Sequence, residues 1–370
     1  MDEREPMTDV RELLERLVTT PGPTGGEGPR LEAIHQWARQ AGLPTRSDAA
    51  GNVWIEIGPE GPWEDSLLLD AHVDVVGAGG ADRLVEQDGR LVGAGVADDL
   101  AAVALLSVFA KYLSEQGFER RRPLRIVLTV GEEGLGNLRG IRQVTDDHPT
   151  APFVLVSLDG SRHKCHVAGL GSNRYRLAGT GEGGHSWSAW GTPSATEAIV
   201  DALVRMRRVR RHVARQVDRL VSFNIGSLAG GEGINCISRA AQATFEFRSP
   251  SADALREVDV GVRSVIHRMS SAGTIDLDLE TVGLRPAADA VDDGTLLNTV
   301  QRVWQRHDVP VAPSVASTNI NVPLTRGWRA VCVGIVDGGN GHRTDEYIET
   351  ASLQTGWAML NDLATELDAM

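Results

Sequence analysis

The stretch Leu67-Leu-Leu-Asp-Ala-His72-Val-Asp74 decides how the whole chain is interpreted. Its apolar residues predict a buried strand over residues 67–71, and His72 and Asp74 then lie at or just beyond the end of that strand. In open α/β sheets, ligands bind in the crevice at the carboxyl ends of the strands. We therefore expect His72 to be a metal ligand whose partners come from other parts of the chain.

The first part of the chain alternates between predicted helices and strands, which indicates an α/β sheet with helices on both faces. The breaker Pro21-Gly-Pro-Thr-Gly-Gly26 separates the first two helices. The predicted helices cover residues 8–19, 27–42 and 100–116, and the predicted strands cover 52–57, 67–71, 125–130 and 153–158.

In the middle of the chain the pattern changes to β-α-β-β-α-β, which predicts a compact inserted domain with two helices over one face of its sheet. After Gly283 the α/β pattern resumes, with a strand over 330–336. We therefore predict a first domain made of residues 1–169 and 284–370, and an inserted domain of residues 170–283. The inserted elements are predicted over 174–177, 194–218, 221–228, 241–247, 252–270 and 275–282, and the helices after them over 294–307 and 351–367.

Composition and charge narrow the classes of partner. The 370 residues carry a formal net charge of -13, which argues against nucleic acid as the main partner because phosphate binding needs a basic face. The basic run from Arg205 to Arg215 is more typical of a solvated helix face than of a nucleic-acid site.

The three cysteines are widely separated and make neither a disulfide framework nor a CxxC metal knuckle. The charged N-terminus and the lack of any apolar run near ~18 residues predict a cytoplasmic protein without a membrane span.

Five ionisable side chains lie at the end of a predicted strand or in the loop just after one. If they converge at one sheet edge, they repel one another and lose hydration unless cations are present. A metal site is therefore expected, with a hydrogen-bonded polar cluster as the alternative. Their chemistry suits zinc, cobalt or manganese, and two metals sharing one carboxylate fit the number of donors better than one catalytic zinc. The five residues are His72, Asp98, Glu133, Asp159 and His342.

Six short segments stand out along the chain. They are His72-Val-Asp74, Gly95-Val-Ala-Asp98-Asp99, Glu132-Glu133, Asp159-Gly160, Gly183-Gly-His185-Ser186 and Gly341-His342. In this order and spacing they resemble the M20 family of di-zinc metallopeptidases over nearly the whole chain. The segment His185-Ser-Trp-Ser-Ala-Trp-Gly-Thr-Pro-Ser-Ala195 looks most like the peptidase T-like (tripeptide aminopeptidase-like) group. The resemblance implies a zinc-exopeptidase-like α/β catalytic domain, with a mixed central sheet flanked by helices, and an inserted α+β ferredoxin-like lid domain.

The resemblance also implies a role for each of the five candidate donors. Asp98 would bridge two metal ions, with His72 and Asp159 completing one site and Glu133 and His342 the other. The metals would be zinc, with cobalt or manganese as alternatives. The peptide bond after Asp98 would be the non-proline cis peptide of the family.

Three other residues have expected catalytic roles. Asp74 would accept a hydrogen bond from the second ring nitrogen of His72 and so fix its tautomer. Glu132 would be the general base that takes a proton from a metal-bound water, and a pair with a nearby Lys or Arg is its alternative role. His185 would donate a hydrogen bond to the oxyanion of the tetrahedral intermediate, often from the partner subunit of a dimer.

Four residues bear on the substrate. Asn235 and Arg248 match lid positions that bind substrate, although a salt bridge within the lid is the alternative role of Arg248. Leu100 and Asn319 depart from the family pattern, which often has Lys at the first position and usually Asp at the second. Both lie beside the site, so the departures bear on the choice of substrate more than on metal binding.

We expect a hydrolase that cleaves an amide bond by attack of a metal-bound water, as an exopeptidase (an aminopeptidase) on short peptides. Asp rather than Glu at position 159 resembles the aminopeptidase and dipeptidase branches. One alternative is an N-acyl-amino-acid deacylase or another biosynthetic amidohydrolase. Two others are a ring or carbamoyl amidohydrolase and a binding module with a vestigial site. The presence of Glu132 and all five donors argues against the binding module. A homodimer through the lid domain is compatible with the resemblance.

Overall fold

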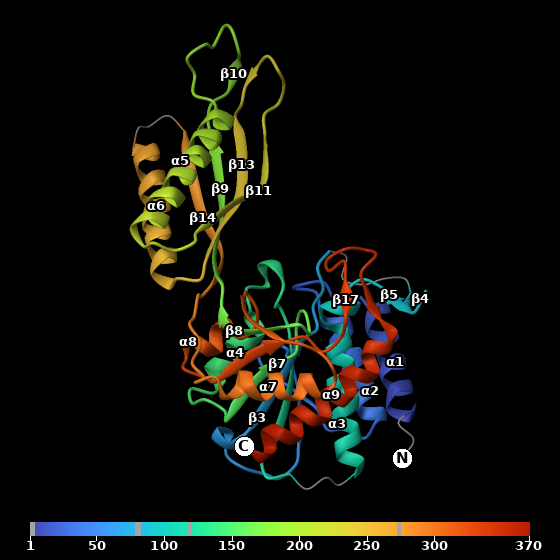
Figure 1. Cartoon of the computed structure of the whole chain (residues 1–370). Coiled ribbons are helices and arrows are strands. Elements are labelled where there is room, and N and C mark those ends of the chain that lie inside the picture. The colour runs from blue at the N-terminus through green and yellow to red at the C-terminus, as the bar shows by residue number, and fades with distance from the viewer. Residues whose placement is uncertain (1–3, 78–82, 117–119, 272–274) are drawn as a thin grey trace. The chain divides into compact units, whose positions relative to one another are not determined.

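The computed structural model describes residues 4–77, 83–116, 120–271 and 275–370 (Figure 1). The chain forms two compact units. The larger unit consists of Met1–Gly169 and Asp289–Met370, and the inserted unit consists of Leu170–Ala288. The inserted unit extends beyond residue 283 because its last strand, β14 (Asp276–Arg285), runs further than its predicted end.

A mixed eight-stranded sheet forms the centre of the larger unit, in the order β1-β2-β6-β3-β7-β16-β8-β15. Strand β3 lies between β6 and β7 and is parallel to both, whereas β2 and β8 run antiparallel to their neighbours β6 and β16. All of β3 is buried, because it has a strand on each side. The strands are β1 (Arg46–Ser47), β2 (Val53–Ile57), β3 (Leu67–His72), β6 (Leu124–Thr129), β7 (Val154–Ser157), β8 (Lys164–Gly169), β15 (Ala312–Ala316) and β16 (Ala330–Val333).

Helices flank this sheet, as the α/β pattern predicts (Figure 1). Helices α3, α7 and α9 share a hydrophobic core with Leu67, Leu69 and Ala71 of β3, whose alternate side chains point to one face of the sheet. No helix in the described part of the chain is long and apolar enough to cross a membrane. The helices are α1 (Arg4–Thr19), α2 (Gly28–Gln40), α3 (Ala101–Gln116), α4 (Arg139–Asp147), α7 (Thr295–Arg306), α8 (Asn321–Thr325) and α9 (Thr350–Ala369), with short turns η1 (Trp63–Asp65), η2 (Val96–Leu100) and η3 (Gly134–Gly136).

A small second sheet holds two loops of the larger unit together, in the order β17-β18-β5-β4. Strand β5 leads into the turn η2 that precedes α3, and residues 340–346 connect β17 to β18. The pairing of β18 with β5 therefore brings the two segments side by side. The strands are β4 (Val85–Gln87), β5 (Arg90–Val92), β17 (Gly338–Gly339) and β18 (Tyr347–Glu349).

Strand β16 ends at Val333, short of the predicted end at 336. The reason is a close approach of two loops, since a Cβ atom added to Gly334 would lie only 1.8 Å from the carbonyl oxygen of Gly160. The chain leaves the sheet at this point and passes directly against the loop that contains Asp159.

The inserted unit is a four-stranded antiparallel sheet in the order β11-β13-β9-β14, with α5 and α6 on one face (Figure 1). Its own core includes Tyr175, Phe245 and Phe247. The β-α-β-β-α-β order and this strand order are those of a ferredoxin-like fold. The elements are β9 (Gly171–Thr180), β10 (Gly184–His185), α5 (Ala195–Gln216), β11 (Ser222–Gly230), β12 (Cys236–Ile237), β13 (Ala240–Ser249), α6 (Ala252–Ser271) and β14.

Candidate metal centre

The carboxyl ends of three adjacent strands gather four of the predicted residues. His72 is the last residue of β3, Glu132 and Glu133 follow β6, and Asp159 follows β7. The strands are parallel, and in their register the end of β3 lies level with the end of β6. The four side chains therefore meet at one edge of the sheet, which is where α/β sheets bind ligands.

Two loops bring Asp98 and His342 to the same edge. Asp98 lies in the turn η2 at the start of α3, and its peptide bond to Asp99 is cis, as the resemblance implies. His342 lies in the loop between β17 and β18 with a left-handed backbone, φ 66°. Its side chain is 52% exposed, so solvent reaches the site from this direction.

The five candidate donors form two groups of three that share one member. In each group the ligand atoms lie no more than 4.8 Å from one another. One group contains His72, Asp98 and Asp159, and the other contains Asp98, Glu133 and His342. Asp98 belongs to both groups, and its two carboxylate oxygens face different histidines. Oδ1 lies 2.9 Å from Nε2 of His72, and Oδ2 lies 3.1 Å from Nε2 of His342. This is the arrangement in which one carboxylate can bridge two metal ions.

The hydrogen bonding of His72 provides a test of whether a cation fits here. Its Nδ1 donates to the main-chain carbonyl of Asp74 at 3.0 Å, which leaves a lone pair on Nε2 in the neutral ring. That lone pair faces Oδ1 of Asp98, another acceptor. Two acceptors 2.9 Å apart require a cation, either a proton or a metal ion, at this position. The donor set therefore fits a divalent metal.

The expected partner atom on Asp74 was wrong. The Asp74 carboxylate oxygen Oδ1 is 3.7 Å from Nδ1 of His72, and the carbonyl oxygen accepts the hydrogen bond instead. The buried carboxylate accepts the main-chain N–H groups of Glu132 and Glu133, both at 2.9 Å, and the hydroxyl of Thr24. Asp74 thus holds the loop after β6 as well as orienting the imidazole.

The pKa values of these groups show how strongly the donors repel and attract one another. Burial, followed by the charge of Asp98, raises the pKa of Asp159 to about 7. Burial also opposes ionisation of Asp98, but hydrogen bonds from His342 and His72 lower its pKa well below the usual range. The hydrogen bond to Asp98 raises the pKa of His342 to about 9. Asp98 thus stays ionised, and its charge favours protonation of Asp159 and His342 beside it, as expected where a cation can bind.

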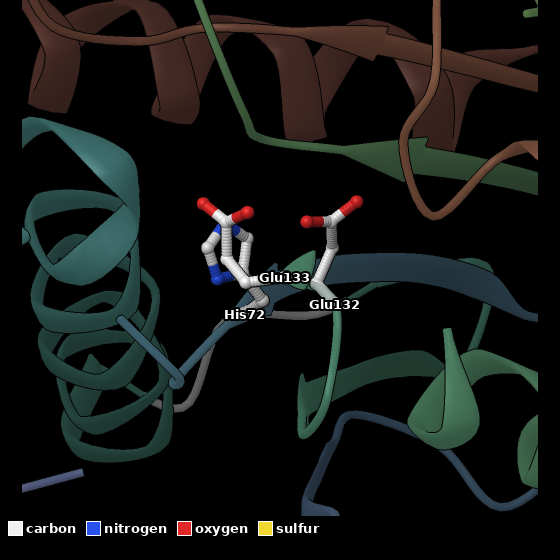
Figure 2. Close-up of side chains that lie close together, drawn as sticks. All are labelled: His72, Glu132 and Glu133. Atoms are coloured by element: carbon white, nitrogen blue, oxygen red, sulfur yellow. The ribbon is translucent and has the colours of Figure 1, made fainter. Parts of the chain in front are cut away.

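Glu132 lies beside the donors without belonging to the two groups that share Asp98. Its carboxylate lies within 4.8 Å of the ligand atoms of His72 and Glu133. Figure 2 shows the carboxylates of Glu132 and Glu133 pointing to the same side, with that of Glu133 next to the His72 ring. Glu132 is only 5% exposed. An acid in this position can exchange protons with a molecule bound at the donors.

His185 lies in the two-stranded ribbon of β10 and β12 in the inserted unit. Its Nδ1 accepts the main-chain N–H groups of Trp187 at 3.2 Å and Ser188 at 3.4 Å. An accepting Nδ1 carries no proton in the neutral ring, so the proton is on Nε2. Because the side chain is exposed, His185 presents an N–H donor to its surroundings.

The two predicted substrate-binding residues lie at different ends of the inserted sheet. Asn235 is next to His185, because its carbonyl accepts the N–H of Ser186 at 2.9 Å. Arg248 pairs with the first residues of β9 at the other end, and its Nε donates to Glu246 at 2.7 Å. The structure thus brings Asn235 and His185 together and leaves Arg248 apart, in the salt bridge expected as its alternative.

The two departures from the family pattern have local explanations. Leu100 is fully buried in the core of the larger unit, where an apolar side chain fits. Asn319 donates to Oδ2 of Asp70 at 2.5 Å and to Oγ1 of Thr129 at 2.8 Å. An aspartate at this position would face the Asp70 carboxylate, whose pKa burial already raises to about 6 despite hydrogen bonds from Ser157 and Asn319.

Two buried acids beside the donors were missed from the sequence. The carboxylate of Asp99 accepts the main-chain N–H of His72 at 3.1 Å. Glu346 accepts main-chain N–H groups of the segments that carry Asp98 and His342. Each of the two follows an aspartate, Asp98 or Asp345, so the local pattern did not single them out.

A helix-flanked sheet with histidines and carboxylates at its strand ends, beside a further glutamate, is typical of metal-dependent hydrolases. Peptidase family M20/M25/M40 matches residues 68–366, and the chain belongs to this family. The family expected from the sequence is thereby confirmed.

Solved peptidase structures share the fold, including a catalytic and a lid domain. A tripeptidase from Staphylococcus aureus subsp. aureus mu50 has a TM-score of 0.79 and 19% identity, covering 98% of this chain and 99% of that chain. Aminopeptidase PepT from Bacillus cereus ATCC 10987 has a TM-score of 0.74 and 19% identity, covering 98% of each chain. The expected fold class is therefore confirmed.

Curated relatives include hydrolases of a different amide. A probable succinyl-diaminopimelate desuccinylase of Staphylococcus epidermidis is 21% identical over 346 residues, or 82% of this chain and 82% of that protein. Across the curated relatives, the matched share of their own length ranges from 48% to 95%. Similarity alone therefore defines an M20-family hydrolase and leaves peptide and N-acyl substrates both open.

Proposed function

We propose that this protein is a metal-dependent amide hydrolase that removes the N-terminal residue of short peptides. The observation that carries the proposal is the pair of three-donor groups that share Asp98, with Glu132 beside them. The fold likeness to the S. aureus tripeptidase and the B. cereus aminopeptidase supports peptides as the substrates.

The five donors would hold two divalent ions, which we propose to be zinc, with cobalt or manganese as alternatives. His72 and Asp159 would bind one ion, Glu133 and His342 the other, and Asp98 both. Ions bound there would polarise the scissile carbonyl and lower the pKa of a water molecule. The main-chain carbonyl of Asp74 would keep His72 in the tautomer whose Nε2 can bind metal.

Glu132 would act as the general base. It would take a proton from the attacking water as the water oxygen bonds to the carbonyl carbon. It would then deliver that proton to the amine nitrogen as the carbon–nitrogen bond breaks. The hydrogen bond from its main-chain N–H to Asp74 fixes the start of this loop, so the carboxylate is held at the donors.

His185 would stabilise the tetrahedral intermediate. Because its Nδ1 accepts main-chain N–H groups, its Nε2–H is the donor available to an oxyanion. Loss of one such donor typically costs about 3 kcal/mol of transition-state stabilisation. Asn235, held next to His185 through Ser186, would contact the same substrate.

A second candidate function is the hydrolysis of N-acyl amino acids. The desuccinylase relative from S. epidermidis, which matches most of this chain, supports it. The two functions use the same donors and the same base. They differ in whether the substrate has a free α-amino group or an acyl group on that nitrogen.

A substrate panel distinguishes the two functions. Purified protein reconstituted with zinc, cobalt or manganese would be incubated with di- and tripeptides, their N-acetylated forms, and N-acetyl and N-succinyl amino acids, with products identified by mass spectrometry. We expect release of the N-terminal residue from free peptides and two metal ions per chain. Turnover confined to the N-acyl amino acids would refute the peptidase assignment.

The substitution Glu132→Gln tests the general base. We expect kcat to fall at least ~100-fold, because the amide cannot accept the proton, while two metal ions remain bound. Glu60→Gln is the matched control, since this exposed glutamate lies outside the site. A Glu132→Gln protein with the kcat of the unchanged enzyme would exclude the assigned role.

The homodimer and the cytoplasmic location remain predictions. Strand β11 is an edge strand of the inserted sheet and carries the exposed Leu228, features that favour pairing with a second copy. Sedimentation velocity at micromolar concentration tests the dimer, and a single monomer boundary would contradict it.

A further inference from the structure

Glu346 is a buried carboxylate whose side chain accepts hydrogen bonds from main-chain N–H groups. It lies at the end of the loop between β17 and β18 and is 1% exposed. Its two oxygens together accept four main-chain N–H groups. These donors are Gly95 at 3.1 Å, Ala97 at 2.7 Å, Asp98 at 3.0 Å and His342 at 3.3 Å.

The four N–H groups belong to two segments that are far apart in the sequence. Three precede α3 and include the candidate bridging residue Asp98, and the fourth is that of His342, which approaches Oδ2 of the same Asp98 through its ring. Oε1 binds Ala97 and Asp98, whereas Oε2 binds Gly95 and His342. One side chain thus connects the main chains of both candidate ligands.

The two segments have backbones that need support. His342 has φ 66°, a left-handed conformation that a residue with a Cβ adopts only when its surroundings impose it. Gly95 has φ 76°, and a Cβ on it would come within 2.3 Å of the Val75 side chain. Hydrogen bonds to an ionised acceptor are roughly twice as strong as neutral ones, so Glu346 is well suited to hold both segments.

We propose that Glu346 is a positioning residue that sets the distance between Asp98 and His342. It would thereby set the affinity for the metal ion held by Asp98, Glu133 and His342. The inference rests on the proposed function, since it requires Asp98, Glu133 and His342 to bind metal. The four donors to Glu346 lie in the segments of Asp98 and His342, whereas His72 and Asp159 lie at the ends of β3 and β7. The ion held by those two residues and Asp98 is therefore less affected than the ion held by Glu133 and His342.

Metal titration of Glu346→Gln, by calorimetry and by competition with a chromogenic chelator, tests this role. A glutamine offers one oxygen and one NH2 group, and the NH2 would face main-chain N–H groups that need an acceptor. We expect zinc to bind the unchanged protein in two steps. In Glu346→Gln we expect one of the two steps, that of the ion held by Glu133 and His342, to lose ~10–100-fold in affinity and the other step to change much less.

Glu349→Gln is the matched control, because Glu349 lies in the same segment but forms an exposed ion pair with Arg90. It should bind zinc as the unchanged protein does. If Glu346→Gln does not fold, as judged by circular dichroism of the metal-free protein, Glu346→Asp is titrated instead. Aspartate keeps both oxygens but withdraws them by one methylene, and the same selective loss is expected.

Two results would overturn the inference by itself, and a third would refute the metal centre on which it rests. Unchanged affinity at both steps would show that Glu346 does not position the ligands. Equal weakening of both steps, together with lower stability of the metal-free protein, would show a general structural role. Failure of the unchanged protein to bind two zinc ions would instead refute the metal centre of the proposed function.

Discussion

At the scale of single residues, the site depends on main-chain hydrogen bonds as much as on the candidate ligands. The carbonyl of Asp74 fixes the tautomer of His72, and the N–H groups of Trp187 and Ser188 fix that of His185. In each histidine, the nitrogen that contacts the main chain determines what the other nitrogen can do. Nε2 of His72 is left to bind a cation, and Nε2 of His185 is left to donate a proton.

The protonation of Asp159 predicts how stability depends on pH when no metal is bound. Its pKa is about 7 in the folded chain, mainly because of burial, against an ordinary value of 3.8. A carboxyl group with a raised pKa stabilises the fold below its unfolded pKa, and this contribution is lost as the pH rises to about 7. We therefore expect the metal-free protein to become less stable between pH 5 and pH 8.

Urea unfolding in the presence of a chelator measures this effect. The fall in stability should be smaller in Asp159→Asn and smaller in the metal-loaded protein, because a bound cation compensates the carboxylate charge. A metal-free protein whose free energy of unfolding rises from pH 5 to pH 8 would contradict the prediction.

At the scale of secondary structure, the end of β3 is connected to the N-terminal helices by one buried arginine. Arg30 of α2 is fully buried, and its guanidinium donates to four main-chain carbonyls. These carbonyls come from the end of α1, the following loop and the residue after His72. They belong to Leu17 at 3.0 Å, Thr20 at 2.8 Å, Gly22 at 3.1 Å and Val73 at 2.6 Å.

We predict that Arg30→Met lowers the free energy of unfolding by about 3 kcal/mol or more. The reason is that several buried carbonyls lose their donors at once. Arg30→Lys should recover only part of the loss, because an ammonium group cannot reproduce the planar fork. Urea denaturation measures both, with Arg39→Met on the exposed side of the same helix as the control. Equal stability of Arg30→Met and Arg39→Met would be inconsistent with this role.

At the scale of the whole molecule, the described residues form two separate hydrophobic cores. One is formed by the central sheet and its helices and the other by the inserted sheet with α5 and α6. All five candidate metal donors belong to the larger unit. Ligands that bind only the folded form of a unit stabilise that unit.

We therefore predict two unfolding transitions in calorimetry. Zinc should raise the midpoint temperature of only one of them, that of the larger unit. The inserted unit should account for the other transition. Phe247→Leu, in the core of the inserted unit, should lower the temperature of the zinc-insensitive transition, because it leaves a cavity there. A single transition whose midpoint temperature rises with zinc would show that the two units unfold together.

Much of the larger unit could be predicted from the sequence because its central strands are short apolar runs. The runs that became β3, β6 and β7 end in acids or a histidine, and parallel strands bring such ends to one edge. Strands β8 and β15 were not predicted. β15 is an edge strand with exposed residues and a proline, Pro313, so it lacks the apolar alternation of a strand buried on one face.

By itself, the sequence determined which side chains could bind metal, because each of the five donors is next to an apolar run or in the loop after one. Only the tertiary structure decided the contacts of Arg30, Asp74 and Glu346. A local pattern records where a carboxylate or guanidinium is in the chain, but not which main-chain groups face it. The direction of those groups depends on how loops more than 200 residues apart pack together, as they do around Glu346.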